Sequence, residues 1–382
     1  MENTAAAQPF NMPDVIPYSA QWDATFACNF KCTFCLTASG KPMPNELNTD
    51  QSISMIDNLY NEGVWFLKIL GGEPFFRKDM IKIMQHAASK PMILSFSTNA
   101  SLITEEKAQA LYEIRNSIAY IQMSLYGYDE LTYQKVTGDP KNFKRALAGL
   151  KLLCDKGLEV SVLTVATDDN ADKIPAYYEI ARQYGAREFR LTPEVSLGRA
   201  AVEGYKEIDT TPMIWKRLVD SLNKISSTTM PGDPEIMVDA RPLPASYLHK
   251  LTGLSYFYEN CTAATSMTYI DPTGEASPCP FLKQTPDDLR QKYSDITSTN
   301  IMQRPFQEVW NSESFNKFRS YYNPKNNLLG IKEQCRYYKD GSCVPCVVTP
   351  CNCVELTRAI KSLVTNKGDP LNKRKELLIN QG

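Results

Sequence analysis

Short apolar runs alternate with longer amphipathic segments from about residue 20 to residue 210. The apolar runs predict strands at residues 21–26, 64–70, 92–97, 118–125, 159–166 and 187–191. Apolar residues at helical spacing predict helices between them, at residues 52–61, 80–89, 105–115, 143–156 and 171–184. Six strands that alternate with helices indicate parallel βαβ units, either doubly wound or closed into a partial barrel. In both architectures ligands bind beyond the carboxyl ends of the strands, so a site is expected in the loops that follow them.

The pattern loosens after Gly198-Arg199-Ala200. A helix is predicted around residues 211–225, and the proline-rich stretch 231–244 has the composition of a linker. A cysteine-dense segment follows, and it has too little regular structure to bury a core of its own, so bound metal is expected to organise it. We therefore predict an α/β domain at residues 18–210, a bridging helix and linker at 211–254, a small cysteine-rich domain at 255–355 and a tail at 356–382.

Composition and charge exclude several classes of protein. The 382 residues carry 42 Lys and Arg against 43 Asp and Glu, a net charge of −1, whereas nucleic-acid-binding proteins usually present a basic face. No stretch approaches the roughly 18 consecutive apolar residues of a membrane span, and the N-terminus lacks the basic and apolar regions of a secretory signal. We expect a cytoplasmic protein that binds neither nucleic acid nor membrane.

Cysteine changes this picture more than any other residue type. The chain has 11 cysteines, an odd number, and a chain of this length does not need disulfides to complete its core. In a reducing compartment, closely spaced cysteines indicate metal ligands or redox groups. Three lie near the start and seven lie between Cys261 and Cys353. Cys154 stands alone on the apolar face of a predicted helix, where we expect an inert core thiol.

The first candidate site is the run Cys28-x3-Cys32-x2-Cys35, directly after the first predicted strand. Three thiolates from one tight loop can hold three irons of a cubane 4Fe–4S cluster and leave the fourth iron open. An open metal position distinguishes a catalytic centre from a structural one. The alternative is a structural zinc loop, but zinc would want four protein ligands and the chain has only two histidines, His86 and His249.

A second motif, Gly71-Gly72-Glu73-Pro74, directly follows the second predicted strand. Two glycines let backbone groups approach a ligand closely, and the carboxylate can receive an ammonium group. Glycine-rich turns after strands are common, so this tetrapeptide gains its significance from its place beside the cysteine loop.

With these two motifs together, residues 18–210 resemble the radical S-adenosylmethionine superfamily. The resemblance implies a partial (β/α)6, TIM-like barrel with a 4Fe–4S cluster at Cys28, Cys32 and Cys35. In that family the amino and carboxylate groups of S-adenosylmethionine bind the open iron. Reduction, here by an external flavodoxin or ferredoxin type of one-electron donor, then cleaves the sulfonium to methionine and a 5′-deoxyadenosyl radical that abstracts a substrate hydrogen. The cofactors supply this chemistry, while the protein supplies orientation and excludes solvent.

The family pattern also implies roles for single residues around S-adenosylmethionine. Phe34, inside the cysteine loop, would lie beside the adenine. The second motif would hold the methionine amine through Gly71, Gly72, Glu73 and Pro74. Both expectations place the cofactor across the loops that follow the first two strands.

Polar residues after the later strands complete the expected binding site. Asn99 belongs to a turn that matches the family's Thr-Asn-Gly turn, with Ala100 in place of glycine, and Ser124 would bind the methionine carboxylate or the ribose. Lys135 is a candidate partner of the carboxylate, although arginine is more usual there, and Arg199 would contact bound S-adenosylmethionine. Ordinary turn, strand-end and salt-bridge roles are the alternatives for these residues. No catalytic acid or base is assigned.

The cysteine-rich segment opens with Cys261-x12-Gly274-x4-Cys279, which resembles the hairpin at the start of the SPASM/Twitch auxiliary-cluster domain. Further ligands are then implied at the later cysteines, whose spacing departs from the usual one: Cys335, Cys343, Cys346, Cys351 and Cys353. Two auxiliary cubanes would need eight ligands and the segment has seven cysteines, so either a carboxylate completes the set or one iron is open. A single auxiliary cluster with spare thiols and a zinc ribbon are the alternatives.

The arrangement predicts an enzyme with one of two kinds of substrate. Proteins of this type commonly mature ribosomally made peptides by crosslinking or oxidising side chains, and we predict this activity first. Only 27 residues precede Cys28, fewer than a leader-peptide recognition domain needs, and Pro280 stands where related sulfatase-maturing enzymes place an aspartate base. The alternative substrate is a sugar, nucleoside or amino-acid derivative that is dehydrogenated, decarboxylated or epimerised. A non-catalytic electron carrier or zinc scaffold would instead fail to cleave S-adenosylmethionine.

Overall fold

The computed structural model describes residues 17–195, 197–201, 212–239, 245–254, 261–284, 291–322, 346 and 348 of the chain. The strands are β1 (Ser19–Asp23), β2 (Phe66–Leu70), β3 (Ile93–Thr98), β4 (Ile118–Ser124), β5 (Val160–Ala166), β6 (Glu188–Pro193), β7 (Glu235–Val238), β8 (Met267–Ile270), β9 (Glu275–Ser277) and β10 (Thr299–Asn300). The α-helices are α1 (Thr49–Asn61), α2 (Met80–Ala88), α3 (Glu105–Glu113), α4 (Glu130–Thr137), α5 (Lys141–Asp155), α6 (Ile174–Gln183), α7 (Pro212–Ser226), α8 (Ala245–Thr252), α9 (Phe281–Gln284), α11 (Phe306–Trp310) and α12 (Glu313–Ser320). Short 3₁₀ helices are η1 (Pro74–Phe76), η2 (Arg115–Ser117) and η3 (Gly198–Ala201).

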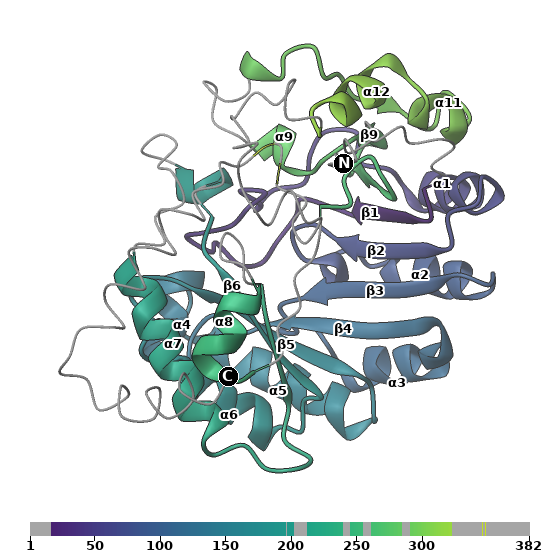
Figure 1. Ribbon diagram of the computed structural model, residues 1–382. Helices are drawn as coiled ribbons and strands as arrows, with labels where there is room; N and C mark the ends of the chain where they lie inside the picture. The colour runs from purple at the N-terminus through teal and green to yellow at the C-terminus, as the bar shows by residue number, and fades with distance from the viewer. Residues whose placement is uncertain are drawn as a thin grey trace, which may run out of the picture.

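The described strands form a single sheet in the order β10-β9-β8-β1-β2-β3-β4-β5-β6-β7 (Figure 1). From β1 to β7 the strands are parallel and follow their sequence order, and β8 is parallel to β1 on its other side. A doubly wound sheet reverses its strand order at a switch point, whereas a barrel adds each strand beside the last. The unbroken order therefore confirms a partial barrel as the correct one of the two predicted architectures.

Helices cover the outer face of the parallel strands, and the apolar side chains of that face form the core. Trp22, Ile69, Phe96 and Met123, from β1 to β4, are at most 1% exposed. Phe75 of η1 packs edge-on against Phe96, with ring centroids 5.5 Å apart. Since burial of one such side chain is worth about 1.5–3 kcal/mol, this layer supplies much of the stability of the barrel.

The helix α4 was missed by the sequence analysis, although both of its ends carry ordinary signals. Asp129 accepts a hydrogen bond from the backbone N–H of Thr132 over 2.7 Å and forms a capping box at the start of the helix. Gly138, with a φ of +89°, ends the helix in the left-handed conformation that favours glycine. The sequence predicted five helices up to residue 184 and one around residues 211–225. These six match α1, α2, α3, α5, α6 and α7 within a few residues.

The proline-rich stretch 231–244 was predicted as a linker, and this prediction is wrong for its first part. β7 forms there and pairs in parallel with β6. Its Ile236 and Val238 are 6% and 1% exposed, so tertiary packing makes a strand from a segment that local composition marks as a loop.

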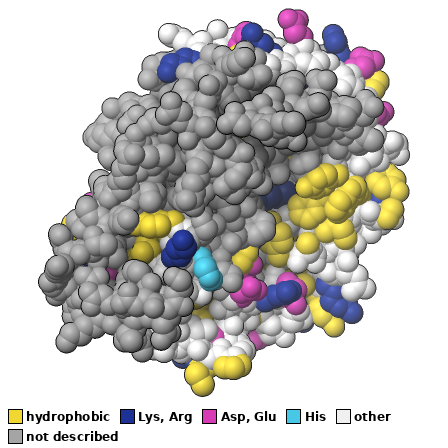
Figure 2. Space-filling view, in the orientation of Figure 1, with side chains coloured by type: hydrophobic (Ala, Val, Ile, Leu, Met, Phe, Trp, Pro, Cys, Tyr) yellow, Lys and Arg dark blue, Asp and Glu magenta, His cyan; other side chains and the backbone are white. Residues whose placement is uncertain are grey.

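The cysteine-rich segment continues the barrel sheet through the β8–β9 hairpin, which lies between Cys261 and Cys279 where the resemblance implied a hairpin. On the surface, charged side chains of both signs lie among one another over the described part of the face in Figure 2, in line with the net charge of −1. No helix in the described part of the chain is long and apolar enough to cross a membrane.

Candidate active site

The three cysteines of the first motif lie on the loop that follows β1, at the carboxyl edge of the parallel strands. The backbone N–H groups of Lys31 and Thr33 donate to the carbonyl oxygens of Thr137 and Val136 over 3.2 and 3.1 Å. These carbonyl groups belong to the last turn of α4, where a helix leaves carbonyl oxygens without an internal partner. The end of α4 therefore fixes the backbone of the cysteine loop.

Burial and mutual repulsion disfavour free thiolates in this loop. Burial raises the pKa of Cys28 to about 11 and raises that of Cys32 even more strongly. The charge of Cys35 adds to both shifts, so the three sulfur atoms lie near one another. A cationic metal centre reverses this balance, because it binds and stabilises the thiolate form. Three soft thiols on one half-buried loop therefore fit an iron–sulfur cluster.

Close backbone contact between the two motifs explains Gly71 and Gly72. A Cβ atom on Gly71 would lie 2.3 Å from the carbonyl oxygen of Thr25, and one on Gly72 would lie 2.3 Å from that of Ala27. Gly71 also has a φ of +131°, which side chains rarely adopt. The N–H groups of Gly72 and Glu73 donate to the same two carbonyl oxygens over 2.7 and 2.9 Å. The glycines thus dock the second motif against the first, a role that the sequence did not reveal.

The carboxylate of Glu73 is completely buried and already has hydrogen-bond donors. It accepts from the Thr98 hydroxyl over 2.8 Å and from the backbone N–H groups of Asn99 and Phe75 over 2.7 and 3.1 Å. Burial nevertheless raises its pKa to about 7. These three bonds make the carboxylate a brace between the second motif and the turn after β3, and its contact with the methionine amine stays a prediction. Pro74, which begins η1, is buried with it.

Asn99 connects the turn after β3 to the cysteine loop. Its side-chain amide donates to the Oδ1 of Asn29 over 3.0 Å, and Asn29 in turn donates to the hydroxyl of Ser101 over 2.8 Å. Ala100 has a φ of +58°, so the left-handed backbone of the family's glycine position is kept without glycine. A Cβ on Gly149 would lie 1.9 Å from the Ala100 carbonyl oxygen, which explains a glycine inside α5.

Arg199 and Gly198 clamp the far side of the cysteine loop. The guanidinium of Arg199 donates to the carbonyl oxygens of Cys32, over 2.6 Å, and Ser39. Its backbone N–H donates to the carbonyl oxygen of Cys35 over 2.9 Å, and a Cβ on Gly198 would lie only 2.0 Å from that of Leu36. Burial is the main cause of the raised pKa of the Cys28 and Cys32 thiols, and the positive charge of Arg199 lowers both values by a smaller amount. The structure thus uses the guanidinium as a clamp, where the sequence suggested a cofactor contact or a rim salt bridge.

Phe34 and Ser124 come together through a residue that the sequence analysis missed, Tyr126. The rings of Phe34 and Tyr126 meet edge-on with centroids 4.9 Å apart. The side chains of Tyr126 and Ser124 are hydrogen-bonded, and burial raises the pKa of the phenol well above its usual value. Its position was a signal, because Tyr126 lies two residues after the end of β4, in a strand-end loop of the kind that binds ligands in this architecture.

The structure does not bring Lys135 into this group. It is exposed on α4, and its charge acts on Asp129 at the start of that helix. The pKa of Asp129 is lowered mainly by hydrogen bonds from Thr132, with a smaller contribution from Lys135. Cys154 lies on α5 as predicted, where burial raises its pKa to about 12.

A second group of thiols lies in the cysteine-rich segment. Burial raises the pKa of Cys279 far above its usual value, and the nearby charges of Cys346 and Cys261 add to this rise. The hydroxyl of Tyr322, another residue that the sequence analysis missed, lies 3.0 Å from the Cys261 sulfur. This donor set fits an auxiliary iron–sulfur cluster in the same way as the first. The remaining predicted ligands lie outside the described residues: Cys335, Cys343, Cys351 and Cys353.

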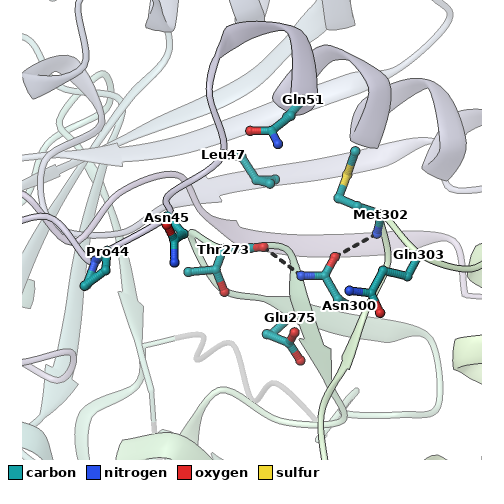
Figure 3. A pocket seen from close by; sticks show the side chains of 9 residues that line it. All are labelled: Pro44, Asn45, Leu47, Gln51, Thr273, Glu275, Asn300, Met302 and Gln303. Carbon is teal, nitrogen blue, oxygen red and sulfur yellow. Dashed lines mark hydrogen bonds between the residues drawn. The ribbon is translucent and has the colours of Figure 1, made fainter.

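The barrel and the cysteine-rich segment meet along β1 and β8. The hydroxyl of Tyr269 donates to the buried carboxylate of Asp23 over 2.6 Å, and the N–H of Leu47 donates to the Pro272 carbonyl oxygen over 2.8 Å. A polar surface pocket opens beside this junction (Figure 3). Its lining comes from α1 and the loop before it, from the hairpin turn and β9, and from β10 and the residues after it: Pro44, Asn45, Leu47, Gln51, Thr273, Glu275, Asn300, Met302 and Gln303.

The inner face of the barrel sheet is polar and partly exposed, in contrast to the helix-covered outer face. Partly exposed inward positions run across the sheet, at Gln21, Lys68, Ser97, Gln122, Leu163, Arg190 and Thr192. The Gln122 amide donates to the Ser97 hydroxyl over 2.9 Å, and Arg190 pairs with Glu188 over 3.0 Å. A closed eight-stranded barrel fills its interior with side chains. Here the described residues leave the inner face accessible to a ligand.

Both halves of the chain match families of known proteins. The model described as "Radical SAM superfamily" matches residues 23–181, and the SPASM model, described as "Iron-sulfur cluster-binding domain", matches residues 261–337. The chain is 30% identical over 307 residues to the mycofactocin maturase MftC of Mycolicibacterium smegmatis, an alignment that covers 79% of this chain and 72% of that protein.

The chain is similar to two further proteins, to one in sequence and to the other in fold. The chain is 26% identical over 332 residues to an AdoMet-dependent heme synthase of Nitratidesulfovibrio vulgaris, which covers 83% of this chain and 84% of that protein. Its fold is similar to that of Streptococcus suis SuiB, solved bound to precursor peptide SuiA. The TM-score is 0.62 and the identity 17%, over 80% of this chain and 67% of that one.

Proposed function

Because the chain belongs to the radical S-adenosylmethionine superfamily, we propose that it is an enzyme of that family that crosslinks or oxidises a side chain of a ribosomally made peptide. The observation that carries this proposal is the 30% identity to a maturase over 72% of that protein's length. The alignment covers 79% of this chain, and so it extends well beyond residues 23–181, which match the superfamily model. The similarity to the maturase therefore includes chain outside the superfamily model.

Cys28, Cys32 and Cys35 would hold the 4Fe–4S cluster, whose open iron would bind S-adenosylmethionine. Together these groups supply a carbon-centred radical that abstracts a hydrogen atom from the substrate. The protein holds the three thiols in place through the end of α4, the bond from Asn99 to Asn29 and the fork of Arg199. Phe34 and the pair of Ser124 and Tyr126 would border the bound S-adenosylmethionine.

The inner face of the barrel would receive the substrate. Hydroxyl and amide side chains such as Ser97 and Gln122 can pair with the N–H and carbonyl groups of an extended peptide. This surface lies below the carboxyl edge of the strands, where the cysteine loop follows β1. A peptide side chain on this face would therefore point towards the cluster loop.

The cysteine-rich segment would take part in electron transfer. Cys261, Cys279 and Cys346 would be among the ligands of one or two auxiliary clusters, and these would accept the electron left after hydrogen abstraction or bind the substrate. An external one-electron reductant of the flavodoxin or ferredoxin type would start the reaction. The Tyr322 hydroxyl, which lies 3.0 Å from the Cys261 sulfur and donates to the Ala263 carbonyl oxygen over 2.8 Å, would border the auxiliary centre.

A small-molecule substrate is the second candidate function. The similarity to the heme synthase, 26% over 84% of that protein, favours it. Arg190 and Glu188 of the inner face are paired with each other, and the cation Lys68 suits an anionic small molecule as well as an acidic peptide.

Anaerobic incubation of the reconstituted protein with dithionite, S-adenosylmethionine and a synthetic precursor peptide encoded beside the gene tests the proposal. We expect 5′-deoxyadenosine in the solution and a change in peptide mass that tandem spectra assign to a side chain. Formation of 5′-deoxyadenosine without a peptide product, together with turnover of a porphyrin, sugar or nucleoside substrate, would establish the second candidate instead.

The variant with alanine at Cys28, Cys32 and Cys35 tests the cluster assignment. Three cubanes hold about twelve irons and two hold about eight, so the variant should lose about four irons per chain and all 5′-deoxyadenosine formation. Cys154→Ala is the matched control, because it removes a half-buried thiol from α5 and should lose neither. Normal 5′-deoxyadenosine formation by the triple variant would contradict the assignment.

A further inference from the structure

Lys68 is the one charged inner-face residue of β1 to β6 whose side chain has no partner in the described part of the chain. Its neighbours Leu67 and Ile69 are completely buried on the outer face, so the ammonium group lies on the inner side of β2. The other charged groups there are paired: Asp23 with Tyr269, and Glu188 with Arg190. A half-buried ammonium group without a counter-ion is costly unless a ligand supplies one.

The side chains beside Lys68 on the two neighbouring strands also lack hydrogen-bond partners within the described residues. In the backbone register of the sheet, Gln21 of β1 and Ser95 of β3 lie opposite Lys68. Ser95 is completely buried, and its hydroxyl oxygen has no hydrogen-bond partner. The half-buried amide of Gln21 has none among the described residues either. Since neighbouring strands lie about 4.8 Å apart, the three side chains can reach a single ligand group.

The three groups share one chemistry, because each of them can donate hydrogen bonds. An ammonium group offers three donors, an amide two and a hydroxyl one. A carboxylate is the matching ligand: it carries the opposite charge, and its two oxygens accept several hydrogen bonds. A buried hydroxyl without a hydrogen-bond partner costs about 1–3 kcal/mol of stability. A ligand that hydrogen-bonds to Ser95 therefore binds with a more favourable free energy.

We propose that Lys68, Gln21 and Ser95 form a carboxylate-binding subsite that anchors the substrate on the inner face of the barrel. Lys68 lies two residues before the end of β2, about 7 Å below the edge where the loops begin. This depth separates it from the positions expected to bind S-adenosylmethionine. The inference rests on the proposed function only for the source of the carboxylate, which in a peptide is an Asp or Glu side chain or the C-terminus.

Protection of Lys68 from acetylation tests the subsite directly. The reconstituted protein is treated with sulfo-N-hydroxysuccinimide acetate, and mass spectrometry follows the rate of acetylation at each lysine. Glutarate should slow the reaction of Lys68 several-fold and leave that of Lys82, an exposed lysine on α2, unchanged. Glutaramide, which has the same length but no charge, should slow neither reaction.

Two variants that keep the lysine sharpen this test. Gln21→Leu and Ser95→Ala should each weaken the protection by glutarate, because each removes one donor. Equal acetylation of Lys68 with and without glutarate would overturn the proposal, and so would protection by inorganic phosphate but not by glutarate. The readout needs no turnover, so its failure is distinct from a failure to modify peptides.

A peptide substrate, once identified, extends the test to catalysis. Replacement of the anchoring Glu or Asp of the peptide by its amide should lower kcat/KM about tenfold or more in the wild type. The same replacement should have little effect in Lys68→Met, and its full effect in Lys82→Met. Equal losses in Lys68→Met and the wild type would contradict the subsite.

Discussion

The two faces of the barrel sheet differ more than any other two regions of the molecule. On β2, Ile69 is completely buried under the helices, while its neighbour Lys68 is partly exposed on the inner face. On β3, Phe96 and Ser97 form the same kind of pair. The outer face is apolar and closed, whereas the inner face is polar and open, with donors that have no partner.

This difference separates stability from binding within each strand. Apolar burial on the outer face holds the barrel together, so the inner face is free to carry groups that a core would not tolerate. The loops at the carboxyl edge belong to neither face. They are held by hydrogen bonds between backbone and side chains, such as those of Glu73 and Arg199.

The largest effect is expected from the outer face. Phe96→Ala should lower the free energy of unfolding by about 3–5 kcal/mol, because it opens a cavity between β3 and η1. Ser97→Ala, the next residue on the inner face, loses only the hydrogen bond from Gln122 and should cost less than about 1 kcal/mol. Urea denaturation of the two variants measures the contrast. Equal losses would mean that the inner face also carries the stability.

Glu73 should make stability depend on pH. Its pKa is raised by burial from 4.5 to about 7 in the folded chain, so the protonated form is favoured by folding. This contribution is complete below about pH 4.5 and is lost as the pH rises through about 7, and it amounts to about 3 kcal/mol. Glu73→Gln cannot ionise and should lack this pH dependence.

Denaturation of the wild type and Glu73→Gln at several pH values between about 4.5 and 8 checks this expectation. The stability of the variant relative to the wild type should rise with pH across this range. A parallel pH dependence of both proteins would show that the carboxylate is ionised throughout and that its three donors outweigh its burial.

The strands β1 to β6 and the two motifs were predictable from the sequence because each depends on local pattern, whereas that pattern left the strand order open between a doubly wound sheet and a partial barrel. The alternating apolar runs predicted β1 to β6, and the cysteine spacing predicted a loop of three ligands. The glycine motif was recognised as well, but its physical role was not. That role depends on how closely residues 25–27 approach Gly71 and Gly72, a distance that no local pattern encodes.

The contacts that the sequence did not reveal join residues that are distant in sequence. Glu73 binds to the turn after β3, and Arg199 reaches back 167 residues to the carbonyl oxygen of Cys32. β7 becomes a strand only because β6 lies beside it. Tyr126 and Tyr322 were missed because tyrosine is common in the chain, with 20 residues, and has no spacing signature.

Arg199 should have the next largest effect, and a more local one. Arg199→Gln removes the charge and the two hydrogen bonds to carbonyl oxygens, which should cost about 2 kcal/mol of unfolding free energy and lower the iron content of the cysteine loop. Arg199→Lys keeps the charge but cannot span both carbonyl oxygens, so its loss should be intermediate. Iron analysis after reconstitution and urea denaturation measure both effects.

Arg187→Gln is the matched control for this clamp. Arg187 lies directly before β6 and forms an exposed ion pair with Glu159, so its loss should change neither iron content nor stability measurably. If Arg199→Gln kept its full iron content and lost only affinity for S-adenosylmethionine, the cofactor contact predicted from the sequence would replace the clamp.

The smallest change in stability, with a clear change in binding, is expected at Tyr126. Tyr126→Phe removes the hydroxyl that is hydrogen-bonded to the Ser124 side chain, at a cost of about 1 kcal/mol. If Ser124 binds S-adenosylmethionine, its hydroxyl is then no longer held in position, and the Kd should rise several-fold in equilibrium dialysis. Tyr133→Phe is the control, because its hydroxyl makes only a long contact, 3.4 Å, with the Ser124 backbone oxygen. An equal rise in both variants would assign the effect to packing around α4 and not to the orientation of Ser124.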